Sequence, residues 1–129
     1  MKGYTLVQLI IVLALISIVA GYFSFQMSGT VDTVKLQAAA KMIASDLRNA
    51  QALAVSSHTS QQVEFDRDFY TAQGIKKKIP APVKVDTPLI FSFAPSGLPH
   101  PGFSGTLKLN AKGKTVSVIL SSQGRIRIE

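Results

Sequence analysis

The feature that most constrains this chain is an uncharged, apolar stretch near its start. No charged side chain occurs between Lys2 and Asp32. From Leu6 to Phe25, sixteen of the twenty residues are apolar. The four exceptions are Gln8, Ser17, Gly21 and Ser24. A helix of this length spans about 30 Å, the hydrocarbon thickness of a bilayer. The segment therefore predicts a membrane-spanning helix.

The apolar stretch is expected to remain part of the mature protein. A secretory signal peptide has a shorter apolar core, which is followed by small residues at a cleavage site. Here the run is long enough to span a membrane, and polar chain follows it directly. Lys2 and the amine of Met1 lie ahead of the run, and positive groups favour the cytoplasmic side. This orientation predicts a single-pass membrane protein whose remainder lies on the side away from the cytoplasm.

The residues ahead of the apolar stretch resemble the processing site of type IV prepilins. A basic residue and a glycine, Lys2-Gly3, directly precede the aromatic Tyr4. The match continues through Thr5, Leu6 and Leu9. The resemblance implies that a prepilin peptidase cleaves after Gly3 and methylates the new terminus at Tyr4.

Gln8 departs from the prepilin pattern, in which a glutamate stands five residues after the cleavage. In that family the carboxylate neutralises the terminal ammonium of a neighbouring subunit inside the filament core. A neutral amide can hydrogen-bond the ammonium but cannot cancel its charge. Gln8, the position assigned to subunit assembly, is therefore a tolerated variant, the mark of a low-copy or tip subunit, or a sign of lost assembly.

The same resemblance divides the chain into three parts. Residues 1–3 are a leader, 4–27 a transmembrane and filament-core helix, and 28–129 a periplasmic or extracellular globular domain. About 100 residues suffice for one small domain and not for two. Cysteine is absent, which excludes a disulfide framework and thiolate metal sites. The globular domain must therefore be held together by packing.

The first part of the globular domain has the pattern of an amphipathic helix. Apolar residues recur at steps of three and four, which indicates one buried stripe. These residues are Leu36, Ala39, Ala40, Ile43, Leu47, Ala50 and Ala54. We expect the helix to end at about residue 57, in a run of small polar residues, and to pack on a sheet.

Beyond residue 60, alternating apolar residues predict five or more antiparallel strands. Ala111–Lys114 suits a hairpin turn with Gly113 at positive φ, and Ser122–Gly124 suits a second turn before the last strand. The stretch 95–105 holds three prolines and three glycines, which indicates an exposed loop. The predicted class is α+β, a long N-terminal helix packed on a small antiparallel sheet, which is the architecture that the pilin resemblance implies.

A second resemblance lies in the C-terminal half. The segments Ile90–Gly97 and Ser121–Ile128 look like those of the GspH/FimT family of minor pilins and pseudopilins. In that family, an ending of the form glycine-arginine-any-arginine is associated with pilins that bind DNA during uptake. Gly124, Arg125 and Arg127 match this ending residue by residue.

The chemistry of the ending allows two interpretations. In strand geometry Arg125 and Arg127 project from one face, roughly 7 Å apart, and their forked donors suit phosphate oxygens. The alternative is a solvated face on a half-buried edge strand. Of fourteen basic residues nine lie in 76–129, beside two of the seven acidic ones. Binding of double-stranded DNA through the ending together with Lys108, Lys112 and Lys114 is therefore a hypothesis.

The other charged residues and the two histidines give weaker evidence of a function. Lys76-Lys77-Lys78 has the pattern of an exposed loop. The acidic residues Glu64, Asp66 and Asp68 suit a hairpin turn better than a cation site. His58 and His100 lack metal-ligand spacing, and no nucleophile or phosphate-loop motif occurs. We therefore expect neither an enzyme nor a metal or other cofactor.

Three functions remain open from the sequence. The first is a minor pilin of a type IV pilus that binds DNA through its basic C-terminal surface. The second is a GspH-type pseudopilin of a type II secretion system, which binds partner pseudopilins and secreted proteins. The third is a membrane-anchored module that does not polymerise.

Overall fold

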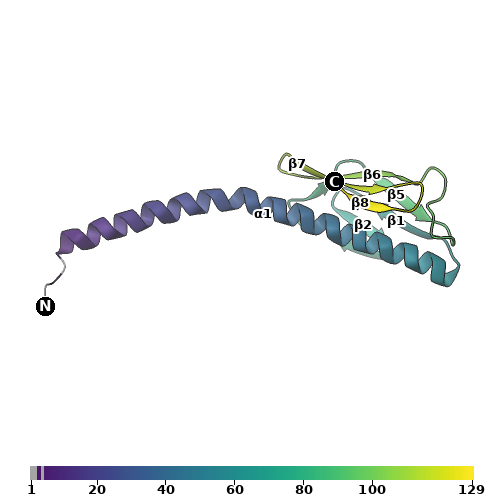
Figure 1. Ribbon diagram of the computed structural model, residues 1–129, viewed down its shortest axis with the longest axis horizontal. Coiled ribbons are helices and arrows are strands. Elements are labelled where there is room, and N and C mark those ends of the chain that lie inside the picture. The colour runs from purple at the N-terminus through teal and green to yellow at the C-terminus, as the bar shows by residue number, and fades with distance from the viewer. Residues whose placement is uncertain (1–2, 4) are drawn as a thin grey trace. The chain divides into compact units, whose positions relative to one another are not determined.

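The structure is a computed structural model that describes residue 3 and residues 5–129, without the side chains of residues 26–28. In this part of the chain, one helix, α1 (Leu6–Ser57), is followed by eight strands (Figure 1). The chain forms two compact units. The first ends at Val31, and the second comprises Asp32–Glu129.

The second unit contains the C-terminal part of α1, which carries the predicted apolar stripe. All seven residues of that stripe are at most 1% exposed. Charged residues such as Lys35, Lys41 and Arg48 lie on the exposed side of the same helix. The prediction of an amphipathic helix that ends near residue 57 is confirmed.

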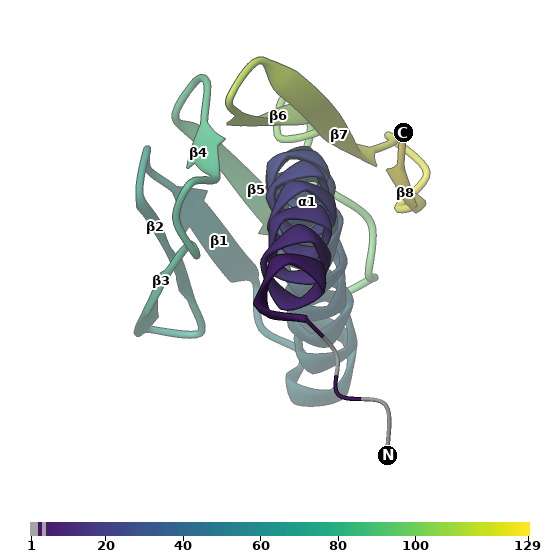
Figure 2. The same cartoon turned by 90° about the vertical axis from the view of Figure 1, so that its left-hand side faces the viewer.

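The strands form two antiparallel sheets beside this part of α1 (Figures 1 and 2). The first sheet has the order β3-β2-β1-β5 and the second the order β4-β6-β7-β8. The strands of the first sheet are β1 (Gln61–Phe65), β2 (Phe69–Ala72), β3 (Ile75–Lys78) and β5 (Leu89–Phe93). Those of the second are β4 (Lys84–Val85), β6 (Gly105–Ala111), β7 (Lys114–Leu120) and β8 (Ile126–Ile128). The prediction of five or more antiparallel strands is confirmed, but the strands form two sheets rather than one.

One apolar core joins α1 to both sheets. In the first sheet, Phe65 stacks on Tyr70 at 5.4 Å between ring centroids and meets the edge of Phe91 at 5.7 Å. The second sheet adds buried side chains at alternate positions, among them Leu107 and Val118. Alternation along most strands turns one face of each sheet to this core and the other to solvent, whereas in β5 the successive residues Phe91, Ser92 and Phe93 are all buried.

The structure corrects one local prediction. Residues 76–78 form strand β3 rather than an exposed loop. β2 and β3 are joined by Gln73 and Gly74, whose φ values of 55° and 75° suit a two-residue hairpin. Two lysines also find partners, since Lys77 binds Asp46 and Lys76 lies over the Phe69 ring.

Two predicted turns are present. The β6–β7 turn has Lys112 at φ 48° and Gly113 at φ 84°. The turn ahead of β8 has Gly124 at φ 79°. Loop 94–104 lies between β5 and β6, as the proline and glycine content predicts.

Candidate functional surfaces

The largest apolar surface is the N-terminal part of α1. Its large apolar side chains between Leu6 and Phe25 are 53 to 90% exposed. In the described residues, α1 is the helix long and apolar enough to cross a membrane, with a mean hydropathy of 2.6 over its most apolar window. A surface of this kind requires lipid, detergent or other apolar helices around it.

The polar residues within this surface make their hydrogen bonds inside the helix. The Ser17 hydroxyl donates to the Leu13 carbonyl at 2.8 Å, and the Ser24 hydroxyl donates to the Ala20 carbonyl at 3.0 Å. Such bonds spare a helix the cost of bare hydroxyls in an apolar medium. These two serines therefore do not oppose burial in a bilayer or a filament core.

Gln8 forms part of the helix start. Its backbone N–H lies 3.4 Å from the Thr5 Oγ1, and the Thr5 N–H donates to the Gln8 Oε1 at 3.1 Å. This reciprocal pair is a capping box, which satisfies donors that would otherwise be free at a helix N-terminus. Glutamine and glutamate both serve in this role, so the start of the helix does not require the charge that the prepilin pattern carries.

The proposed cleavage site lies just ahead of this cap. Gly3 is exposed, and a Cβ added to it meets nothing within 4 Å. Packing against the residues that the structure describes therefore does not call for glycine at this position. Tyr4, the residue expected to be methylated, lies outside the described residues.

The basic C-terminal ending lies on the solvent face of the second sheet. Arg127 is opposite Ile119 on β7, and Lys108 on β6 is opposite Ser117 of the same strand. Opposite residues of antiparallel strands share a face, and so do residues two apart on one strand, such as Ser117 and Ile119. Arg127 and Lys108 therefore share a face, with their Cα atoms about 12 Å apart. Arg125 precedes β8, and all three side chains are exposed.

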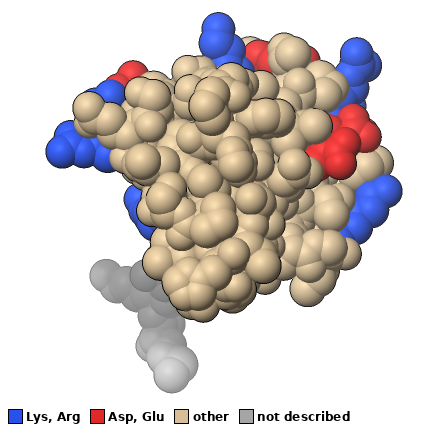
Figure 3. All heavy atoms as spheres, turned by 90° about the vertical axis from the view of Figure 1, so that its right-hand side faces the viewer, with Lys and Arg blue, Asp and Glu red and all other residues tan. Residues whose placement is uncertain are grey.

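Glu129 interrupts this basic face. It exchanges two backbone hydrogen bonds with Ser117, at 2.7 and 2.8 Å, and therefore lies in the same row as Lys108. The end view in Figure 3 shows Lys and Arg side chains spread around the rim, with acidic side chains beside several of them. On the face drawn there, they do not gather into one patch.

Lys112 and Lys114 belong to a different arrangement. Lys112 forms an ion pair of 2.9 Å with Asp32, whose side chain is only 13% exposed. Lys114 donates to the Thr33 hydroxyl. Both lysines thus join the β6–β7 turn to α1. Of the basic residues predicted to bind DNA, Lys108 and Arg127 share the solvent face of the second sheet. Lys112 and Lys114 contact α1 instead.

The predicted turn at Gly124 also makes a contact with α1 that the sequence does not reveal. The Gln51 amide of α1 donates to the Gly97 carbonyl at 2.6 Å and to the Gly124 carbonyl at 3.2 Å. A Cβ on Gly124 would stand 2.9 Å from the Gln51 Nε2 and 3.2 Å from the Gly97 oxygen. Both positive φ and close packing therefore call for glycine here.

A second polar cluster was also missed by sequence reasoning. Asp46 on α1 accepts hydrogen bonds from the Tyr70 hydroxyl and from the Lys77 ammonium, the latter at 2.9 and 3.0 Å. Burial, together with the neighbouring Asp46 carboxylate, raises the pKa of the Tyr70 phenol well above its usual range. The cluster fastens the first sheet to the helix. Spacing alone could not have joined these residues.

Two of the three acidic residues considered for a cation lie in a turn, and the third lies in a strand. Glu64 lies in β1, while Asp66 and Asp68 lie between β1 and β2. Among the residues that the structure describes, no three His, Cys, Asp or Glu side chains converge in a way that could hold a metal ion.

Comparison with solved structures finds crystal structures of the type IV minor pilin FimU of Pseudomonas aeruginosa strain PAO1. One, in space group P21, has a TM-score of 0.63 at 19% identity and covers 78% of this chain and 92% of FimU. Another, in space group P65, has a TM-score of 0.59 at 20% identity and covers 73% and 92%. No protein-family model matches the sequence, and no curated protein matches it. At these identities the likeness shows a shared fold.

Proposed function

We propose that this chain, which has the type IV pilin fold, is a minor subunit of a filament of the type IV pilus class. The observation that carries the proposal is the exposed apolar part of α1, joined to a unit with this fold. Before assembly this helix anchors the protein in the inner membrane, with the globular unit in the periplasm. In the filament the same surface packs against the helices of neighbouring pilins.

Assembly requires removal of the leader by prepilin peptidase after Gly3 and methylation of Tyr4. The unobstructed surroundings of Gly3 support this assignment, because the residues that the structure describes leave this position open to a peptidase. Gln8 would face the terminal amine of a neighbouring subunit as a neutral hydrogen-bonding group. A filament that accepts few copies of such a subunit tolerates the missing charge best. The chain accordingly acts as a binding and assembly subunit rather than an enzyme.

The test is made in cells that carry a pilus machinery. The wild-type protein is expected to lose residues 1–3 and gain one methyl group at Tyr4, as measured by mass spectrometry of the intact protein. Gly3→Ala should remain an unprocessed precursor in the membrane. A normal mature N-terminus in this variant would refute the assigned cleavage, and an absence of the processed wild type from sheared filaments would refute assembly into a pilus.

A finer part of the proposal is that the solvent face of β8 holds double-stranded DNA. The supporting observation is that Arg125, Arg127 and Lys108 are exposed and that two of them share a face. Contacts of this kind reach the phosphate backbone without reading sequence. Lys112 and Lys114 contribute at most a positive electrostatic potential to DNA binding, because their ammonium groups contact α1.

DNA binding is tested by fluorescence anisotropy of labelled duplex DNA with the full-length protein in a neutral detergent. Binding should weaken as salt is raised and should be largely lost in Arg125→Gln/Arg127→Gln. The matched control is Lys35→Gln/Lys41→Gln, which removes the same charge from the exposed side of α1. If the wild type does not bind at low salt, the partners of this surface are proteins, as in a type II secretion pseudopilus.

A further inference from the structure

The first sheet ends in an exposed edge strand. β3 stands at the end of the order β3-β2-β1-β5, and three of its four residues are exposed while Lys77 is half-buried. Lys77 points toward α1, where it binds Asp46. Since side chains alternate along a strand, Lys76 and Lys78 point to the solvent face of the sheet.

The hydrogen-bonding pattern shows which backbone groups this edge presents. The Ile79 N–H donates to the Asp68 carbonyl at 2.9 Å, next to the opposed pair Phe69 and Lys78. Hydrogen-bonded and non-hydrogen-bonded pairs alternate in an antiparallel ladder. Lys78 and Lys76 therefore occupy non-hydrogen-bonded positions toward β2. Their N–H and C=O groups point outward, toward the place of a further strand.

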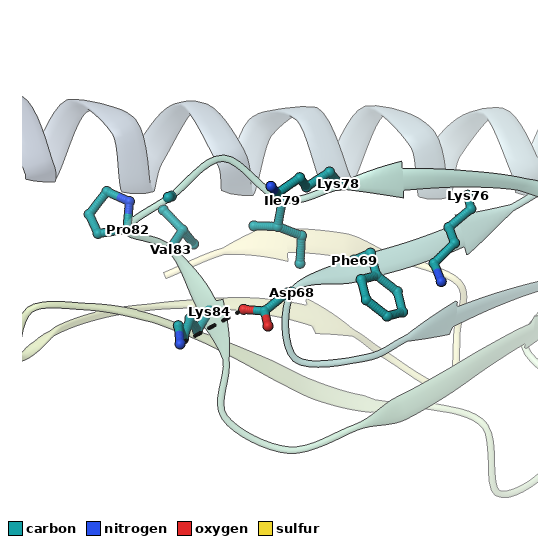
Figure 4. A pocket seen from close by; sticks show the side chains of 9 residues that line it. Asp68, Phe69, Lys76, Lys78, Ile79, Pro82, Val83 and Lys84 are labelled. Carbon is teal, nitrogen blue, oxygen red and sulfur yellow. Dashed lines mark ion pairs between the residues drawn. The ribbon is translucent and has the colours of Figure 1, made fainter.

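A hollow of about 700 Å³ adjoins this edge (Figure 4). Its apolar walls include Phe69, Ile79 and Pro82, and Lys76 and Lys78 stand at its border. The Lys76 ammonium lies 3.6 Å from the centre of the Phe69 ring. The hollow can accept an apolar side chain directly beside the two lysines.

Charge determines which strand fits the edge. Around the hollow, the negative charge of Asp68 is balanced by the ammonium group of Lys84, which lies 3.9 Å from its carboxylate. Lys76 and Lys78 remain as an excess of positive charge. Lysines on an edge strand oppose pairing with neutral or basic strands, including β3 of another copy. An acidic strand is instead attracted to this edge, because its carboxylates can lie opposite the lysines while the two backbones form hydrogen bonds.

We propose that the free edge of β3 binds an extended acidic segment of a partner protein, which adds to the first sheet as an antiparallel fifth strand. Carboxylates of the segment, two residues apart, lie opposite Lys76 and Lys78, and an apolar side chain two residues farther along the same face, beyond Lys78, enters the hollow beside Phe69. Main-chain hydrogen bonds supply affinity, and alternate side chains supply specificity. Binding at this edge requires neither filament assembly nor DNA.

The probe is the fluorescein-labelled peptide Thr-Leu-Thr-Glu-Thr-Glu-Thr with both ends blocked. In an antiparallel added strand, its Glu and Leu residues share one face and turn their N–H groups toward β3. Fluorescence polarisation is measured with the full-length protein in a neutral detergent. We expect saturable binding at low salt that weakens as salt is raised. The peptide with Gln in place of Glu should bind roughly tenfold more weakly.

Two N-methylated peptides separate strand addition from simple attraction of an anion. Methylation of the Glu and Leu amides removes the hydrogen bonds to β3 and should abolish binding. Methylation of the two Thr amides that flank Leu alters groups that point away from β3 and should leave binding within about threefold. Equal binding of both methylated peptides would overturn the proposal and show that the edge attracts any anionic chain.

Protein variants locate the site. Lys76→Gln/Lys78→Gln should weaken binding of the acidic peptide roughly tenfold and leave DNA binding unchanged. Arg125→Gln/Arg127→Gln removes the same charge at β8 and should leave peptide binding unchanged. An equal loss in both variants, or no saturable binding by the wild type, contradicts the assignment to β3. Near-ultraviolet circular dichroism checks that each variant is folded.

Discussion

At the scale of single residues, a few polar side chains of α1 position the sheets. Gln51 contacts the carbonyls of Gly97 and Gly124, and thereby holds loop 94–104 and the turn before β8 with one amide. Asp46 does the same for β2 and β3 through Tyr70 and Lys77. Neither pairing could be predicted from the sequence, because the partners lie 24 to 73 positions apart.

Removing the Gln51 amide is expected to destabilise the globular unit. Gln51→Ala leaves the Gly97 and Gly124 carbonyls without this donor, at a cost of about 1–3 kcal/mol. The free energy of unfolding is measured by urea denaturation in a neutral detergent. Asn49→Ala, on the exposed side of the same helix, is the control and should change stability by less than about 0.5 kcal/mol. Equal effects of the two substitutions would show that the Gln51 contacts contribute nothing.

Tyr70 should make the globular unit less stable at alkaline pH. The pKa of its phenol is raised in the folded state by burial and by Asp46, so folding favours the neutral form. This contribution is fully present below the ordinary tyrosine pKa of about 10, and it falls above that pH by about 1.4 kcal/mol per pH unit. Tyr70→Phe removes the titrating group. Stability from pH 8 to 11 should therefore fall more steeply in the wild type than in this variant, whereas parallel curves would contradict the assignment.

At the scale of elements, periodicity located the helix and the longer strands. The apolar stripe of α1, the β6–β7 hairpin and the turn at Gly124 follow from residue spacing and turn chemistry. β2, β3 and β4 were missed because they are short, and because three successive lysines resemble a loop. β2 and β3 are held by Asp46 of α1, and β4 pairs with the distant strand β6, contacts that local sequence does not reveal.

The candidate DNA surface was only partly foreseeable for the same reason. Strand alternation predicted that Arg125 and Arg127 are exposed, and they are. The partners of Lys112 and Lys114 on α1 lie about 80 positions earlier in the chain. Only tertiary contact reveals that these two lysines belong to the turn and helix.

Two neighbouring residues at the start of β8 should respond differently to substitution. Ile126 packs against the core, so Ile126→Asp brings a charge to an apolar site and should cost about 3 kcal/mol or more. Arg125→Ala should change stability by less than about 0.5 kcal/mol, because this side chain is exposed. Thermal unfolding of both variants provides the measurement. The reverse order would mean that the inner and outer faces have been exchanged.

At the scale of the whole molecule, charge and apolar surface are divided between the two units. The first unit is uncharged from Gly3 to Val31, and its large apolar side chains are exposed. The second unit buries its own core and carries thirteen of the fourteen basic residues. The same protein can therefore be held by lipid through one unit while the other stays in water.

This division predicts how the protein partitions. The wild type should remain with membranes after an alkaline carbonate wash. Leu13→Arg places a charge near the middle of the apolar run, at a cost of about 2.5–3.5 kcal/mol for insertion, and should shift protein out of the membrane fraction. Because Leu13 lies outside the second unit, the melting temperature of the globular unit in detergent should not change. A lower melting temperature would show that the units are not independent.

The two lysines of the β6–β7 turn have a mechanical consequence. The chain of α1 enters the second unit at Asp32 and Thr33, the residues held by Lys112 and Lys114. A pulling force transmitted along the helix therefore acts on these contacts before it acts on the apolar core. The β6–β7 turn is the first part of the second unit to bear that force. Under tension, Lys112→Ala/Lys114→Ala should let the helix peel from the second sheet at lower force, although the resting stability changes little.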